Sequence, residues 1–199
     1  DRGRLIIMCE IEEKSVEIKV TEKFATDENG EDQYRYVLIK EWGQADKPVV
    51  VIMYNPSDAD YLMYDKTVMN VENYFKKKKF NKIIILNLFA IKGKNSSIVS
   101  KANQKYENKN KEYIGNYIKE SDDIYLAWGY GKAGKSQKIK DKIKEIEKLV
   151  YTEKINTIKQ VRAFADEGQV NVKCHPQNMN IDTWTDIEYD FSHLKGNKS

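Results

Sequence analysis

The stretch VVVIMYNPS, residues 49–57, is a continuous apolar run that ends on Asn55 and the Pro-Ser after it. Two later runs also end on polar residues, IIIL before Asn87 and VNVKC before His175, and the run IYLAW ends on Gly129. Continuous apolar strands separated by helical stretches are typical of a parallel sheet that is buried on both faces. Ligands of open parallel sheets bind at the carboxyl ends of the strands. We therefore expect these four strand ends to converge on one site.

The fold class that these runs predict is α/β, a three-layer α/β/α arrangement around a central, mainly parallel sheet. In the last predicted helix, apolar residues mark one face while lysines and glutamates cover the other. Helices are expected over residues 67–79, 101–120 and 135–149, and further strands over 161–164 and 170–174.

The N-terminal region shows a different pattern, which predicts antiparallel β structure over residues 10–42. The segment SVEIKV alternates, an Asn-Gly turn signal follows within 27–32, and YRYVLIKEW resumes as a strand. We interpret 1–44 as an N-terminal β extension of a single domain, residues 1–199, and 185–199 as a C-terminal tail.

Composition indicates a globular protein of the cytoplasm. The chain of 199 residues is 40% hydrophobic and 33% charged, and no apolar run approaches the ~20 residues that span a bilayer. The start, DRGRLIIMCEIEE, turns acidic at once, so we do not interpret it as a signal peptide. Cys9 and Cys174 give no disulfide framework, which fits a reducing compartment. We expect no membrane partner.

Lysines are concentrated in the middle of the chain. Residues 66–119 contain thirteen Lys against three Glu, an excess of ten positive charges, whereas residues 1–34 and 166–190 each sum to −5. A basic stretch between acidic flanks fits one phosphate-binding face and predicts DNA as a partner. For residues 76–79 alone, a solvated lysine surface is the preferred interpretation.

The segment GYGKAGKS, residues 129–136, matches the phosphate-binding pattern G-x-x-x-x-G-K-[ST] between a predicted strand and a predicted helix. A nucleotide-binding role would fall to Gly129, Gly134, Lys135 and Ser136. No convincing later strand ends in an Asp that could hold magnesium, so NTPase activity is the second hypothesis. Two His and two Cys do not give a zinc ligand set, and we expect neither a metal nor a cofactor.

Several short motifs together resemble a bacterial and phage family of domains of unknown function, DUF1643, over residues 35–176. The motifs are Arg35-Tyr36-x-Leu38, Trp42-Gly43, Asn55-Pro56-Ser57-x-Ala59-Asp60, Asp65-x-Thr67, Asn87-Leu88-Phe89-Ala90, Ala127-Trp128-Gly129 and His175-Pro176. The family name implies no activity.

The layout is also similar to that of the uracil-DNA glycosylase superfamily. That resemblance implies cleavage of the bond between a pyrimidine, or a modified pyrimidine, and its sugar in DNA. Asn55 would place the water, Asp65 would supply negative charge or act as base, and His175 would donate a hydrogen bond to the departing base. The further roles implied are base reading by Asn87, stacking by Tyr61 or Tyr64, and phosphate contacts by Ser57, Lys66, Lys92 and Lys94.

Each of these residues also has a purely structural interpretation. Asn55 and Ser57 follow a strand and suit a turn, Asp65 suits a helix N-cap, and Asn87 suits a strand end. For His175, packing is as well supported as catalysis. The third hypothesis is accordingly a nucleic-acid-binding module without catalytic activity.

Overall fold

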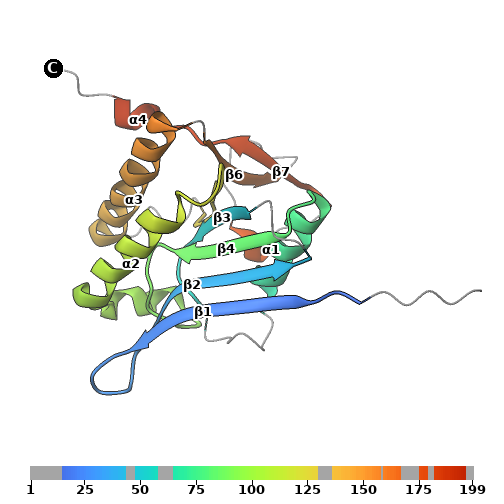
Figure 1. Cartoon of the computed structure of the whole chain (residues 1–199). Coiled ribbons are helices and arrows are strands. Elements are labelled where there is room, and N and C mark those ends of the chain that lie inside the picture. Colours follow the sequence, from blue (N-terminus) through green and yellow to red (C-terminus); the bar gives the residue numbers. More distant parts are fainter. Residues whose placement is uncertain are drawn as a thin grey trace, which may run out of the picture.

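A computed structural model describes most of the chain (Figure 1). The described residues are 15–43, 48–57, 65–129, 136–157, 159–166, 175–178 and 182–195.

Within these residues seven strands form one sheet in the order β1-β2-β4-β3-β5-β6-β7. The strands are β1 (Ile18–Thr26), β2 (Gln33–Trp42), β3 (Pro48–Met53), β4 (Lys82–Asn87), β5 (Asp123–Leu126), β6 (Gln160–Asp166) and β7 (Trp184–Glu188). The α-helices are α1 (Lys66–Lys77), α2 (Gln104–Tyr117), α3 (Gln137–Asn156) and α4 (Ser192–Lys195), and the 3-10 helices include η1 (Ser96–Lys101) and η3 (Pro176–Asn178).

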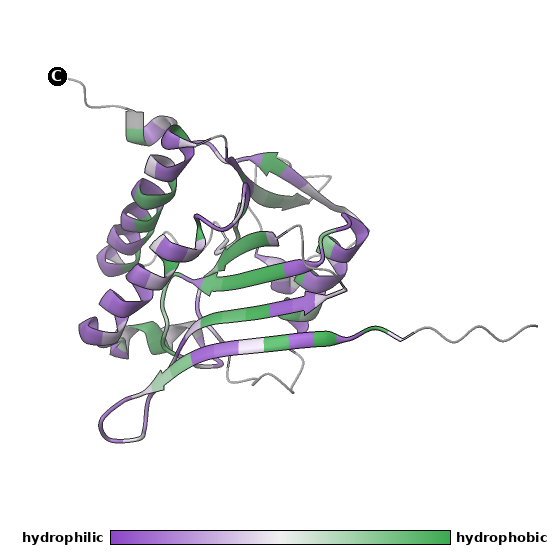
Figure 2. Cartoon of the chain, in the orientation of Figure 1, coloured by the Kyte–Doolittle hydropathy of each residue, from purple (hydrophilic) through white to green (hydrophobic). Residues whose placement is uncertain are grey.

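The sheet is mixed. Its four central strands, β4, β3, β5 and β6, run parallel to one another. On one side β2 is antiparallel to β4 and β1 is antiparallel to β2, and on the other side β7 is antiparallel to β6. Parallel pairing is thus confined to the centre, where the apolar runs are continuous (Figure 2).

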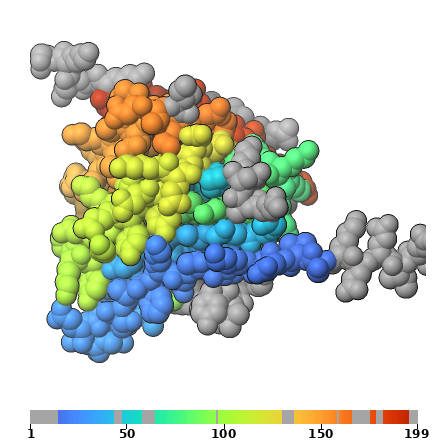
Figure 3. Space-filling view, viewed as in Figure 1, coloured from blue at the N-terminus to red at the C-terminus, as the bar shows by residue number. Residues whose placement is uncertain are grey.

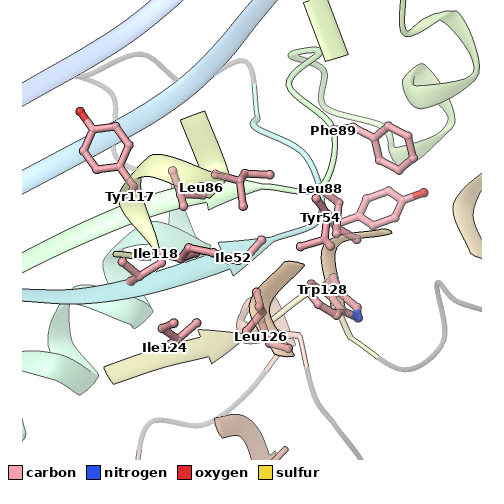
Figure 4. Close-up of a cluster of buried hydrophobic side chains, with 14 of the residues drawn as sticks. Ile52, Tyr54, Leu86, Leu88, Phe89, Tyr117, Ile118, Ile124, Leu126 and Trp128 are labelled. Carbon is pink, nitrogen blue, oxygen red and sulfur yellow. The ribbon is translucent and has the colours of Figure 1, made fainter. Parts of the chain in front are cut away.

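Alternate residues of the central strands pack against different helices. Val50 and Ile52 of β3 belong to a cluster with apolar residues of α2 and α3, which we call the α2–α3 side (Figure 4). Val49, Val51 and Met53 belong to a second cluster with apolar residues of α1, which we call the α1 side. Because side chains alternate along a strand, both faces of β3 are buried, which explains why its sequence is apolar throughout.

The prediction of antiparallel β structure near the N-terminus is confirmed for the described residues. Strands β1 and β2 pair around the turn at residues 27–32, where the Asp27 carboxylate accepts hydrogen bonds from the backbone N–H groups of Glu31 and Asp32. Gly30 has φ of 76°, a left-handed conformation that glycine adopts without strain.

Two elements near the C-terminus differ from expectation. Helix α3 continues past residue 149 to Asn156, because Val150 is buried and extends its apolar face. Residues 185–199, expected to form a tail, instead include most of β7 and all of α4. Pairing with β6 and burial of the neighbouring aromatic residues Trp184, Tyr189 and Phe191 explain this order. The strand expected at 170–174 lies outside the described residues.

Among the described helices, none is long and apolar enough to cross a bilayer.

Candidate functional site

A cavity of about 250 Å³ lies at the carboxyl end of β3. It is bounded by β2, by the start of α1, by the loop after β4 and by the segment that begins η3. The lining residues are Arg35, Met53, Tyr54, Asn55, Ser57, Asp65, Thr67, Val68, Gly93, Lys94, His175 and Gln177. We call this cavity the β3 pocket.

Asn55 is the second residue after the end of β3 and is partly buried. Its Nδ2 donates hydrogen bonds to the carbonyl oxygens of Pro56, at 3.0 Å, and Gly93, at 2.9 Å. The second bond joins the end of β3 to the loop after β4. The amide group of Asn55 is therefore held in one orientation at the pocket wall.

Asp65 is the N-cap of α1 and lines the same pocket. Its Oδ1 accepts hydrogen bonds from the backbone N–H of Thr67, at 2.6 Å, and of Val68, at 3.2 Å. Burial raises the pKa of Asp65, but the neighbouring Ser57 hydroxyl and these hydrogen bonds outweigh it, so the pKa lies below its ordinary value. Asp65 is therefore ionised at neutral pH.

Arg35 is a pocket residue for which the sequence suggested no role in the site. It lies on β2, is 2% exposed, and has Nη1 3.6 Å from Oε1 of Glu22 on β1. Burial lowers the pKa of Arg35, while the negative charges of Glu22 and Asp65 raise it. Two sequence signals pointed to Arg35: it is a charged residue inside the apolar strand YRYVLI, and it begins the motif Arg35-Tyr36-x-Leu38.

His175 immediately precedes η3 and lines the pocket. Its Nδ1 accepts a hydrogen bond of 3.2 Å from the backbone N–H of Gln177. A nitrogen that accepts carries no proton, so in the neutral ring the proton lies on Nε2. Asn70 of α1 donates a hydrogen bond to the Pro176 carbonyl at 3.0 Å, which holds η3 against α1.

Gly129, after β5, lies directly against His175. A Cβ added at Gly129 would be 3.0 Å from the Cβ of His175, and the φ of Gly129 is +78°. Of the four expected strand-end residues, Asn55 and His175 thus line the β3 pocket. Gly129 does not line the pocket but lies next to His175.

Asn87, the last residue of β4, is not among the residues that line the β3 pocket. It is 1% exposed, and neither polar atom of its side chain has a hydrogen-bond partner among the described residues. Ile83 and Ile85 of the same strand pack on the α1 side, so alternation points Asn87 to that side too. Its partner in the sheet register is Met53, which does line the pocket.

The sequence profile of the family described as "Protein of unknown function (DUF1643)" matches residues 35–176. The chain belongs to this family. No curated protein and no solved structure matches the chain. The DUF1643 match begins at Arg35 and ends one residue after His175, so all the lining residues of the β3 pocket except Gln177 lie inside it.

The residues expected to contact phosphate are only partly brought together in this DUF1643 chain. Ser57 and Lys94 line the pocket. Lys92 and Lys66 do not; Lys92 donates a hydrogen bond to the Gln33 side chain at 3.2 Å, and Lys66 is the exposed first residue of α1. Tyr61 and Tyr64, expected to stack on a base, lie outside the described residues.

The alternative nucleotide-binding segment is described only at its two ends. Ser136 is the N-cap of α3, where its Oγ accepts a hydrogen bond from the backbone N–H of Ile139 at 3.4 Å. Gly134 and Lys135 lie outside the described residues. In the described part of the chain, His, Cys, Asp and Glu side chains form no group of three or more that could hold a metal ion.

Proposed function

We propose that this protein hydrolyses the N-glycosidic bond of a pyrimidine, or a modified pyrimidine, in DNA, with the base turned out into the β3 pocket. One observation carries the proposal: His175 lines the same cavity as Asn55 and Asp65, although it lies more than a hundred residues after them in the sequence. A three-layer α/β/α arrangement and action in the cytoplasm are parts of the same proposal.

The hydrogen bond from Gln177 favours the His175 tautomer that the proposed role requires. With Nδ1 accepting from Gln177, the neutral imidazole presents an N–H at Nε2. A hydrogen bond from Nε2 to an oxygen of the base would stabilise the negative charge that develops as the bond to the sugar breaks. Gly129 leaves room for His175 at this position, because a Cβ at residue 129 would lie 3.0 Å from the Cβ of His175.

Asp65 supplies the charge that the sugar requires. Its carboxylate is ionised because the start of α1 stabilises the negative form, and a negative charge beside the sugar stabilises an oxocarbenium-like transition state. Asn55, whose Nδ2 is bound to Pro56 and Gly93, is proposed to place the attacking water with its carbonyl oxygen.

Base reading by Asn87 requires the pocket to extend inward past Met53. The unpartnered amide of Asn87 supports this role, because a buried amide without hydrogen bonds is costly unless a ligand satisfies it. We propose that Ser57 and Lys94, at the pocket, contact the phosphates that flank the flipped nucleotide.

The activity can be tested directly with the purified protein. Oligonucleotides that contain uracil, hydroxymethylcytosine or glucosylated cytosine are incubated with it and then treated with alkali, which cleaves abasic sites. We expect cleavage of at least one substrate, and a loss of about a hundredfold or more in His175→Ala. His193→Ala is the matched control, because His193 bonds to Glu147 and does not line the pocket.

Cleavage by His175→Ala equal to that of the wild type would contradict the proposal. Salt-sensitive DNA binding without cleavage of any substrate would favour the inactive binding module. Saturable ATP or GTP binding that Lys135→Ala abolishes would favour the nucleotide-binding alternative.

A further inference from the structure

Strand β1 lies at one end of the strand order of the sheet. Within the described part of the chain it is paired on one side alone, with β2 (Figure 1), and Figure 3 shows it, in blue, along the lower border of the coloured atoms. The backbone N–H and C=O groups on its other side form a row that a further strand can pair with. No proline interrupts residues 15–26.

This edge carries an exposed apolar stripe on the α1 side of the sheet. Val16, Ile18 and Val20 are 69%, 56% and 36% exposed. Val20 pairs with Lys40, which forms an ion pair with Glu72 of α1, and directly opposed residues of antiparallel strands share a face. The stripe thus continues the α1 side beyond the part that α1 covers.

We propose that this edge pairs with the same edge of a second copy of the chain, antiparallel, around a two-fold axis that is perpendicular to the sheet and lies midway between the two copies of Ile18. Val16 of each copy then faces Val20 of the other on the α1 side. On the opposite face, Glu17 of each copy faces Lys19 of the other. Apolar residues meet apolar residues and opposite charges meet, as stable cross-strand pairs require.

Neighbouring registers lack this complementarity. Directly opposed residues share a face, so in a symmetric pair one residue must oppose its own copy across the axis. A register centred on Glu17 or Lys19 places that charge against the same charge of the other copy. A register centred on Val20 places Ile18 against the Glu22 carboxylate. The register centred on Ile18 pairs apolar residues on one face and opposite charges on the other.

The dimer would also set the relation between the two sites. Because the axis is perpendicular to the sheet, the α1 side of both copies faces the same way. The β3 pocket is lined by Asp65 and Val68 at the start of α1, so both pockets lie on one face of a continuous sheet.

A charge-reversal cycle tests the partner and the register together. The dimer dissociation constant is measured by sedimentation equilibrium for the wild type, Glu17→Lys, Lys19→Glu and the double variant. Each single change places like charges opposite each other at two symmetric positions, and we expect dimerisation to weaken about tenfold or more. The double variant restores both pairs with their signs exchanged, so we expect it to dimerise like the wild type.

A wild-type chain that stays monomeric at every concentration tested would overturn the proposal. A double variant that dimerises no better than the single ones would overturn this register. Val20→Lys, which places a charge on the apolar stripe, is expected to give a folded monomer with an unchanged circular dichroism spectrum. Both residues of the cycle lie outside the β3 pocket, so the result is independent of the proposed glycosylase activity.

Discussion

At the residue scale, Asp65 has two separable functions, because its carboxylate caps α1 and also charges the β3 pocket. Asn caps helices about as well as Asp but carries no charge, whereas Ala does neither. We expect Asp65→Ala to lower the free energy of unfolding by about 1 kcal/mol, and Asp65→Asn to lower it by much less. Both variants should lose roughly a hundredfold or more of the proposed glycosylase activity.

The pH dependence of stability gives an independent measure of the same carboxylate. The folded-state pKa of Asp65 lies below its ordinary value of 3.8, so its contribution to stability is fully present above that value. The contribution is lost as the pH falls through the folded-state pKa. In urea unfolding, the stability difference between wild type and Asp65→Asn should therefore shrink below pH 3.8; a difference that stays constant there would contradict the assignment.

Arg35 and Asn87 show why the site was only partly predictable from sequence. Asn55, Asp65 and His175 attracted attention because polar residues follow apolar strands or precede a helix. Arg35 lies within β2, where a charged residue is ordinarily taken as solvent-facing; its burial depends on Glu22 of a different strand. Asn87 fits the pattern of a strand end, yet the structure buries it outside the lining of the β3 pocket, beside Met53 in the sheet register, and no local pattern records that packing.

At the element scale, the segment after β5 approaches the residue before η3 so closely that a side chain at Gly129 would collide with His175. Gly129 and Gly43 both have positive φ, +78° and +70°, but only Gly129 faces a neighbour, the Cβ of His175 at 3.0 Å. Backbone strain should lower the stability of Gly129→Ala and Gly43→Ala alike, by about 1 kcal/mol. Gly129→Ala should in addition displace His175.

Activity and the NMR signals of the His175 imidazole separate these two effects. We expect Gly129→Ala to shift the imidazole signals and to lose the proposed activity. Gly43→Ala should leave the imidazole signals and the activity unchanged, although its backbone strain is similar. Equal activity in the two variants would show that the close approach of Gly129 to His175 is not needed for activity.

The elements themselves were predictable to different degrees. The continuous run in β3 predicted a strand buried on both faces, and Asn29-Gly30 predicted the turn between β1 and β2, since both signals are local. Strand β7 was missed because the segment WTDIE has no continuous apolar run. The strand forms because it pairs with β6, and the indole of Trp184 packs on Phe164 of that strand.

At the scale of the whole molecule, Asp186 joins α1 to β7, the strand at one edge of the sheet. Its carboxylate accepts hydrogen bonds from Lys78 and Tyr74 at the end of α1, at 2.5 and 3.2 Å, and from Tyr125 of β5 at 2.9 Å. Arg162 of β6 lies 3.3 Å away. Burial raises the pKa of Asp186, and these partners lower it below its ordinary value.

Removing this charge should therefore destabilise the entire fold. We expect Asp186→Asn to lower the free energy of unfolding by about 2 kcal/mol, because Lys78, Tyr74 and Tyr125 lose a charged, partly buried acceptor. Arg162 keeps its ion pair with Asp123. The matched control is Asp182→Asn, which removes an exposed ion pair with Lys77 and should cost at most about 1 kcal/mol. Chemical denaturation of the two variants measures the difference, and equal losses would rule out a joining role for Asp186.

The position of the pocket follows from the path of the chain. After β3 the chain adds β4 on one side, and after β4 it crosses over β3 to add β5 on the other. The connections thus part in opposite directions above β3, and this divergence opens a crevice at its carboxyl end. The recess is therefore a property of the topology, and the side chains that line it decide only its chemistry. Members of a family that share this strand order can exchange Asn55, Asp65 or His175 for other residues and still possess a cavity, each with a different ligand.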